Sequence, residues 1–275
     1  MAPDVANVQH AAFDTTGTAA IIEHLNGPLP RRDIWAVHPC PLVPVLPARV
    51  ASPAEAASLV DKLAQLQKIR QTGLVAILRC PRPEPLVDVC QALADGGVEV
   101  VEITFTVPQA HRVLEQVAAR LGDRVLLGAG TVLDGPTART ALLSGAQFLV
   151  SPHFAPDVLE VALRYGVVCM PGAFTPTEVV RAWQAGADVV KIFPADVLGP
   201  GYLKALRGPL PQVRLLPTGG VDLETGPRFL QAGAFALGAG SALAPARLIE
   251  QGDMDEIRRR AAQFVEMVQQ ARQGQ

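Results

Sequence analysis

Short apolar runs alternate with longer amphipathic segments through most of the chain. Helix-like segments such as VLEQVAARLGD separate the runs. This alternation predicts parallel β-α-β units. The eight expected strands are LVAIL (74–78), VEVVEITF (98–105), RVLLGA (124–129), AQFLVS (146–151), VVCMPG (167–172), ADVVKIF (187–193), VRLLPT (213–218) and AFALGAG (234–240).

A repeated phrase leads into several of these strands: GGVEV, SGAQF, AGADV and AGAFA. Glycine in this position is typical of a helix end that turns directly into a strand. A doubly wound open sheet can use the same units, but eight units in residues 74–275 favour a compact barrel. We therefore expect an α/β fold, a (β/α)8 TIM barrel, with DEIRRRAAQFVEMVQQA as its last helix.

The N-terminal part has a different pattern. HPCPLVPVLPARV (38–50) holds four prolines and is typical of an extended linker. We treat residues 1–51 as a poorly ordered, Pro-rich extension and residues 52–275 as the barrel domain. SPAE (52–55) predicts the start of a helix before the barrel. The residues that follow it at helical spacing are Leu59, Leu63, Leu66 and Ile69.

Composition narrows the classes of function. The net charge of −2 argues against a nucleic-acid-binding surface or a basic face attracted to membranes. No apolar run approaches the roughly 20 residues that cross a bilayer, and the start MAPDVANVQHAAFD lacks the features of a secretory signal. The four cysteines form no CxxC pair and are expected to be reduced. We expect a soluble, cytoplasmic protein.

Polar residues at expected strand ends carry the candidate chemistry, because barrel enzymes place their sites at the carboxyl ends of the strands. In VEVVEITF, the apolar residues Val101 and Ile103 alternate with Glu102 and Thr104, so Glu102 is expected to point into the barrel. The same alternation places Lys191 inside. Arg79, Thr106 and Thr131 follow expected strands and add polar groups to the same end.

A buried lysine beside a carboxylate has two interpretations. Burial lowers the pKa of a lysine, and a neutral lysine can attack a ketone to form a Schiff base while a carboxylate such as Glu102 moves protons. Alternatively, Lys191 and Glu102 form an ion pair that only neutralises two buried charges. Their position at strand ends favours catalysis.

Two glycine-rich turns predict a phosphate site. PTGGV (217–221) and GAGSAL (238–243) follow the seventh and eighth strands, where many barrels bind phosphate through backbone N–H groups. Neither GAGTVL nor GAGSAL completes a dinucleotide-binding GxGxxG motif. No cluster of histidines and carboxylates has metal-ligand spacing, so no metal is expected.

An ordered set of motifs resembles the 2-keto-3-deoxy-6-phosphogluconate aldolase family, which includes 4-hydroxy-2-oxoglutarate aldolases. The motifs are VEITFTVPQA, GAGTVL, SPHF, MPGAFTPTE, VVKIFPA, LLPTGGV and GAGSAL. The resemblance runs from about Ile69 to the C-terminus. It implies a class I aldolase on a (β/α)8 barrel, a homotrimer without metal or organic cofactor. The substrates implied are a 2-keto acid and a phosphorylated aldehyde.

The resemblance also implies roles for individual residues. Lys191 matches the Schiff-base lysine, Glu102 the general acid and base, and Thr131 a residue that holds the pyruvate carboxylate. Some members carry an arginine where this chain has Thr106; another branch reads ITFTVP and has an arginine after the first strand, as Arg79 is here. The phosphate-binding and site-lining positions are Gly219, Gly220, Ser241, Phe193 and Pro171.

The expected reaction is cleavage of 2-keto-3-deoxy-6-phosphogluconate to pyruvate and glyceraldehyde 3-phosphate. Cleavage of 4-hydroxy-2-oxoglutarate to pyruvate and glyoxylate is a plausible second activity. Two alternatives stay open at this point: a phosphate-binding isomerase or epimerase that uses Glu102 without covalent chemistry, and a non-catalytic oligomeric scaffold.

Overall fold

The computed structural model describes residues 62–273 of the chain. The extension at residues 1–51 and the helix start at 52–55 lie outside the described residues, so both stay predictions. Within the described part, no helix is both long and apolar enough to cross a membrane.

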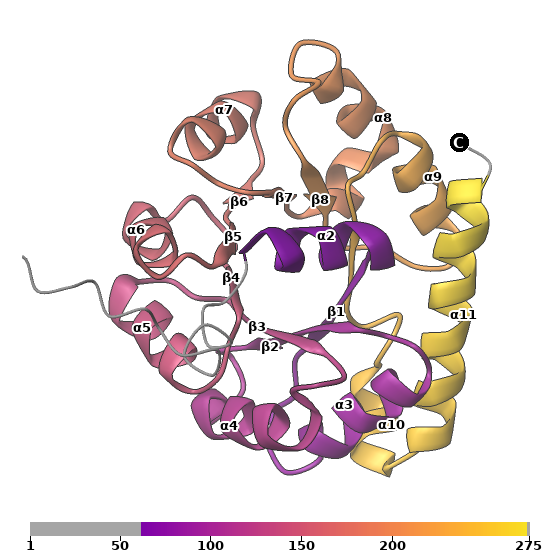
Figure 1. Cartoon of the computed structure of the whole chain (residues 1–275). Helices are drawn as coiled ribbons and strands as arrows, with labels where there is room; N and C mark the ends of the chain where they lie inside the picture. The colour runs from indigo at the N-terminus through magenta and orange to yellow at the C-terminus, as the bar shows by residue number, and fades with distance from the viewer. Residues whose placement is uncertain (1–61, 274–275) are drawn as a thin grey trace, which may run out of the picture. The chain divides into compact units, whose positions relative to one another are not determined.

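Helices and parallel strands alternate, as the sequence pattern predicts (Figure 1). The helices are α2 (Lys62–Thr72), α3 (Leu86–Asp95), α4 (Ala110–Leu121), α5 (Gly135–Leu143), α6 (Pro156–Tyr165), α7 (Pro176–Gln184), α8 (Ala195–Arg207), α9 (Thr225–Gln231), α10 (Ala246–Gln251) and α11 (Met254–Gln273). The strands are β1 (Leu74–Leu78), β2 (Val100–Thr104), β3 (Leu126–Gly130), β4 (Phe148–Val150), β5 (Val168–Met170), β6 (Gly172–Ala173), β7 (Val190–Ile192), β8 (Leu215–Pro217) and β9 (Leu237–Ala239).

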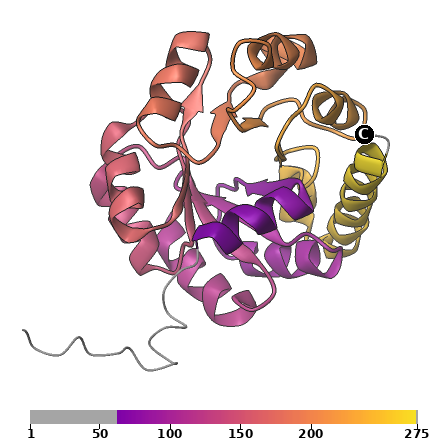
Figure 2. The same cartoon turned by 45° about the horizontal axis from the view of Figure 1, so that its top comes forward.

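The strands form a curled parallel sheet with helices around it (Figures 1 and 2). One sheet has the order β5-β4-β3-β2-β1-β9 and the other the order β6-β7-β8. A bridge between Thr218 and Gly238 connects the end of β8 to β9. The register sets Glu102 of β2 between Ile77 of β1 and Gly128 of β3.

The expected helix-to-strand phrase is present in the structure. The glycine that precedes the strand in each of the four phrases has a positive φ, between 90° and 101°. Only glycine adopts this backbone conformation without strain. The four glycines concerned are Gly97, Gly145, Gly186 and Gly233.

One expected strand is divided in two. The apolar pattern predicts a single strand for VVCMPG (167–172), but β5 ends at Met170 and β6 begins at Gly172. Pro171 lies between them, and proline has no N–H group to continue the hydrogen-bond ladder. Its carbonyl still accepts a hydrogen bond of 2.9 Å from the Lys191 N–H, so the chain stays attached to β7 across the break.

The two faces of the sheet differ in chemistry. Val101 and Ile103 pack in the large cluster that contains the helix residues, as predicted, whereas a second apolar cluster, with Val75, Phe148 and Leu216, fills the interior. Seven polar residues of the described chain are buried, and five of them lie in a strand or directly after one. These five are Glu102, Thr104, Ser151, Lys191 and Thr218.

Helix α2 lies across the opposite end of the sheet (Figure 1). Lys62 pairs with Asp188 at 3.0 Å, and the Gln65 side chain accepts a hydrogen bond from the backbone of β5. Leu63, one of the apolar residues at helical spacing, has an exposed fraction of 71 %. Gln65 and Ile69, four residues apart, occupy the buried face instead.

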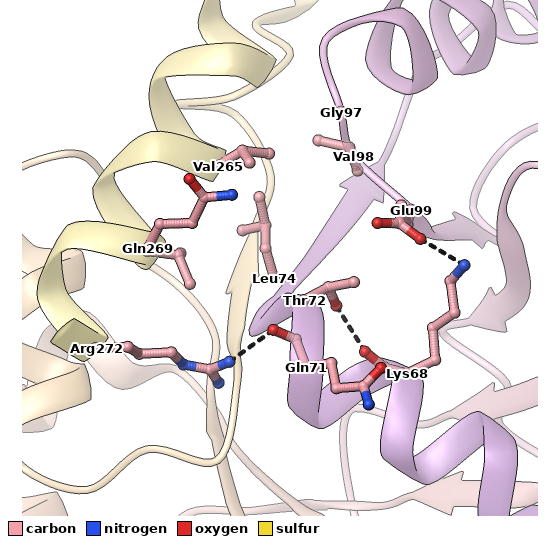
Figure 3. A pocket seen from close by; sticks show the side chains of 11 residues that line it. Lys68, Gln71, Thr72, Leu74, Gly97, Val98, Glu99, Val265, Gln269 and Arg272 are labelled. Atoms are coloured by element: carbon pink, nitrogen blue, oxygen red, sulfur yellow. Dashed lines mark hydrogen bonds and ion pairs between the residues drawn. The ribbon is translucent and has the colours of Figure 1, made fainter. Parts of the chain in front are cut away.

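A cavity of about 240 Å³ lies at this amino-terminal end, between α2 and α11 (Figure 3). Its charged side chains are already engaged. Lys68 pairs with Glu99, and Arg272 donates to the carbonyls of Arg70, Gln71 and Phe235. Among the described residues, Lys68 is therefore neutralised by a carboxylate, and the guanidinium of Arg272 is hydrogen-bonded to backbone carbonyls.

Candidate active site

A larger cleft of about 630 Å³ opens at the carboxyl ends of the strands. Five of the predicted site residues line it: Arg79, Phe193, Gly219, Gly220 and Ser241. The other five lie in strands or shortly after them and do not line this cleft. These are Glu102, Thr106, Thr131, Pro171 and Lys191.

Glu102 is completely buried, and neither of its carboxyl oxygens has a hydrogen-bond partner among the described residues. Burial raises the pKa of this carboxyl group, while the positive charges of Lys191 and Arg79 act in the opposite direction. The net shift is upward. Glu102 therefore keeps its proton to a higher pH than an exposed glutamate, which fits a group that donates and accepts protons.

Lys191 lies in the middle of β7 with an exposed fraction of 6 %. Its ammonium nitrogen is 5.4 Å from the centre of the Phe193 ring, which lines the cleft. Because the oxygens of Glu102 are unpartnered, the two side chains form no direct ion pair within the described residues. The structure therefore does not support the interpretation of Lys191 and Glu102 as a structural ion pair in direct contact.

The end of β2 is tied to the end of β1. The Thr104 hydroxyl donates to the carbonyl of Leu78 at 2.9 Å and lies 2.8 Å from the Thr106 hydroxyl. Since the single Thr104 proton is used on Leu78, Thr106 must be the donor of the second bond. Arg79 directly follows Leu78, so this network fixes the backbone that carries the arginine into the cleft.

Thr131 follows β3 in a left-handed conformation, with φ of 55°. This region is unfavourable for a β-branched residue, and such strain often marks functional sites. Gln109 is the other described non-glycine residue with positive φ, and it lies at the start of α4. Thr131 therefore fits a site residue, and Gln109 fits a helix boundary.

The two glycine-rich turns lie together in the cleft lining. Within the described chain, no hydrogen bond involves the backbone N–H groups of Gly220, Val221, Ser241 or Ala242. Clustered backbone N–H groups without internal partners form a favourable site for an anion. The arrangement can therefore bind a phosphate or a carboxylate.

Asp222 also lines the cleft, but its carboxylate is engaged. Its Oδ1 accepts hydrogen bonds from the backbone N–H groups of Glu224 and Thr225 and from the Thr225 hydroxyl. These bonds, that of the Thr225 N–H above all, lower the pKa of Asp222. The Thr225 hydroxyl also lies 2.7 Å from the carbonyl oxygen of Gly220, so its single proton is shared between this carbonyl and Asp222, and the contact anchors the first turn.

Thr218 was not among the predicted site residues. It lines the cleft, is 6 % exposed, and its hydroxyl has no hydrogen-bond partner among the described residues. The available signal was its position, as the first polar residue after the apolar run VRLLP (213–217). No group of three or more His, Cys, Asp or Glu side chains could hold a metal ion in the described part of the chain.

Comparisons with known proteins identify a family and several relatives that this chain resembles. The family model described as "KDPG and KHG aldolase" matches residues 66–260. The 2-dehydro-3-deoxy-phosphogluconate aldolase of Treponema pallidum is 35 % identical over 203 residues, covering 74 % of this chain and 96 % of the relative. The 2-dehydro-3-deoxy-6-phosphogalactonate aldolase of Escherichia coli is 36 % identical over 171 residues, covering 62 % and 83 %.

A solved structure is similar over the same region. It is the KDPG aldolase of Legionella pneumophila, with pyruvate captured as a covalent carbinolamine intermediate. The TM-score is 0.67 at 26 % identity, and the match covers 72 % of this chain and 96 % of that one.

Proposed function

The chain belongs to the KDPG and KHG aldolase family, and from this premise we propose that it cleaves 2-keto-3-deoxy-6-phosphogluconate through a Schiff base on Lys191. The products are pyruvate and glyceraldehyde 3-phosphate. One observation carries the proposal: a buried lysine and a buried, unpaired glutamate with a raised pKa lie in the middle of β7 and β2.

The Lys191 amine attacks the C2 carbonyl carbon of the substrate and forms a carbinolamine. Glu102 donates a proton to the departing hydroxyl, and loss of water leaves a protonated imine. Glu102, now ionised, accepts the proton of the C4 hydroxyl as the C3–C4 bond breaks. The bond electrons move into the imine to give an enamine, and the aldehyde leaves. Protonation of C3 and hydrolysis of the imine then release pyruvate and free Lys191.

The keto-acid end binds near β1 and β3. Arg79 pairs with the substrate carboxylate through its planar guanidinium, which can form two parallel hydrogen bonds. Thr131 supplies a further contact, and Thr106 supports this end through its bond to Thr104. Phe193 and Pro171 form the apolar walls beside Lys191.

The phosphate end binds at the two glycine-rich turns. Gly219 and Gly220 contribute the first turn and Ser241 the second, through backbone N–H groups and the serine hydroxyl. Because the cleft lining includes both turns and Arg79, one substrate can reach the phosphate and carboxylate sites together.

The choice of substrate is tested by comparing three aldols. The named relatives act on phosphogluconate and phosphogalactonate derivatives, and 4-hydroxy-2-oxoglutarate lacks a phosphate. We expect pyruvate release to be fastest with 2-keto-3-deoxy-6-phosphogluconate. Ser241→Ala removes one hydrogen bond to the phosphate and should raise the Michaelis constant for the phosphorylated aldols by roughly fivefold, with little effect on 4-hydroxy-2-oxoglutarate. Equal effects on all three would contradict the phosphate assignment.

Three further features belong to the same proposal. The two sheets together form a closed (β/α)8 barrel, for which the Thr218–Gly238 bridge is the local support. The enzyme assembles as a homotrimer, as the family resemblance implies. It works in the cytoplasm, where the free, buried thiols of Cys80, Cys90 and Cys169 stay reduced.

Family membership does not favour the non-covalent isomerase or the scaffold. Either would still be recognised by experiment. An isomerase that uses only Glu102 would keep its activity in Lys191→Ala, and a scaffold would release no pyruvate from any of the three aldols.

A further inference from the structure

An arginine of the last helix donates a hydrogen bond to the backbone of the second glycine-rich turn, GAGSAL (238–243). Nη1 of Arg260, in α11, donates to the carbonyl of Ala242 at 3.0 Å. In the described chain, Arg260 is the only side chain that hydrogen-bonds to the backbone of residues 240–245. The adjacent N–H groups of Ser241 and Ala242 are those left available to the cleft.

Arg260 is itself fixed in place. Its Nε donates to Oε1 of Glu256 at 2.8 Å, one helical turn earlier in α11, and both side chains are partly buried. This pair leaves the guanidinium little freedom to rotate away from Ala242. The contact therefore ties the turn to a rigid helix.

The first turn is anchored in the same manner. The Thr225 hydroxyl holds the carbonyl of Gly220 from the side of α9. Each turn thus has one carbonyl engaged by a side chain and its neighbouring N–H groups unbonded. An anion that bridges both turns requires both anchors, because small misplacements of binding groups are costly.

Packing alone does not hold the second turn on the side of Arg260. A cavity of about 300 Å³ lies there, lined by Arg260, Phe264, Leu223 and Glu224, and it shares Asp222 and Ala242 with the cleft. If the hydrogen bond to Ala242 were lost, the turn would have space to move into this cavity.

Resting on the proposed function, we infer that Arg260 is a positioning residue for the phosphate end of the substrate. It sets the second turn so that Ser241 and Ala242 present their N–H groups to a phosphate ester. It does not touch the reacting atoms, and its influence is confined to ligands that carry phosphate.

The test compares Arg260→Gln with a matched control, Arg259→Gln. Arg259 also pairs with Glu256 and carries the same charge, but it has no bond to the turn. For Arg260→Gln we expect the Michaelis constant for the phosphorylated aldol, 2-keto-3-deoxy-6-phosphogluconate, to rise about tenfold, the effect of one hydrogen bond from a charged group. Neither kcat nor the Michaelis constant for the phosphate-free aldol, 4-hydroxy-2-oxoglutarate, should change. Arg260→Lys should recover part of the loss, and Arg259→Gln should match the wild type.

A second measurement does not depend on catalysis. Inorganic phosphate that binds the folded chain raises its Tm. The rise should occur in the wild type and in Arg259→Gln and be several-fold smaller in Arg260→Gln. If aldol cleavage fails but this pattern holds, the proposed function is wrong and the role of Arg260 stands. Equal changes in the Michaelis constants for both aldols, unchanged constants in Arg260→Gln, or the same phosphate response in all variants would overturn the inference.

Discussion

Gly130 provides the space that the Glu102 carboxyl group occupies. A Cβ atom on Gly130 would lie 1.7 Å from Oε1 of Glu102, closer than any non-bonded contact allows. Two residues earlier on β3, a Cβ atom on Gly128 would lie 2.2 Å from the Phe148 ring. The two glycines of β3 thus make room for one carboxyl group and one aromatic ring inside the sheet.

This relationship predicts different consequences for two similar substitutions. Gly130→Ala and Gly128→Ala should each lower the free energy of unfolding by about 1–3 kcal/mol through overpacking. Only Gly130→Ala displaces Glu102, so only it should lower kcat for aldol cleavage, by on the order of 100-fold. The measurements are urea denaturation and steady-state kinetics. Equal losses of kcat in the two variants would show that Gly130 has no specific relation to the carboxyl group.

Burial of Glu102 predicts a pH dependence of stability. The pKa of Glu102 is raised in the folded chain, so the folded chain retains a proton that the unfolded chain has released. The free energy of unfolding of the wild type should therefore fall, relative to Glu102→Gln, as pH rises from about 4.3 toward the raised pKa. The variant should be more stable at pH 7, by about 1.4 kcal/mol for each unit of pKa shift, and the difference should vanish at pH 4.

Glu178 is a control whose pKa is shifted in the opposite direction to that of Glu102. Backbone N–H groups of Phe174 and Thr175 lower its pKa, so its contribution is present above the unfolded pKa and lost as pH falls. Glu178→Gln should be less stable than the wild type at pH 7, with the gap closing in acid. If both variants shift stability in the same direction at pH 7, the burial account of Glu102 is wrong.

Removal of the Thr218 hydroxyl should stabilise the fold and weaken substrate binding. A buried hydroxyl without a partner is unfavourable in the free protein, so Thr218→Val should raise the free energy of unfolding by about 1 kcal/mol. Thr218→Ser keeps the hydroxyl and should bring no such gain. We expect the valine variant to bind the phosphorylated aldol more weakly, with a raised Michaelis constant, because the hydroxyl finds its partner in the bound substrate. A stabilised variant with an unchanged Michaelis constant would leave the hydroxyl without a function.

The sequence pattern was sufficient for the general fold and for the placement of Lys191 and Glu102. Both residues lie within apolar runs. Because successive side chains of a strand point to opposite faces of the sheet, their positions determine that they face the interior. The pattern was insufficient where contacts are tertiary. Gly130 is needed only because Glu102 lies on the neighbouring strand, and Arg260 is separated in sequence by 18 residues from Ala242, the residue it contacts.

One error of prediction and one unexpected core residue have local causes. Pro171 divides a predicted strand because it has no N–H group to continue the ladder. The apolar pattern of residues 167–172 predicted one strand because hydrophobicity does not report this missing donor. On α2, Leu63 is exposed although it belongs to the apolar residues at helical spacing, and Gln65 is buried because its side-chain oxygen accepts a hydrogen bond from the β5 backbone. A polar residue with a backbone partner can thus occupy a core position that composition assigns to leucine.

Borohydride trapping with pyruvate tests the central claim most directly. Borohydride reduces an imine to a stable secondary amine, so intact-mass analysis and peptide mapping locate the lysine that formed it. We predict one reduced pyruvyl group per chain, on Lys191, and none in Lys191→Ala. A folded chain that gains no adduct in a large excess of pyruvate, or that carries it on a different lysine, would contradict the Schiff-base mechanism.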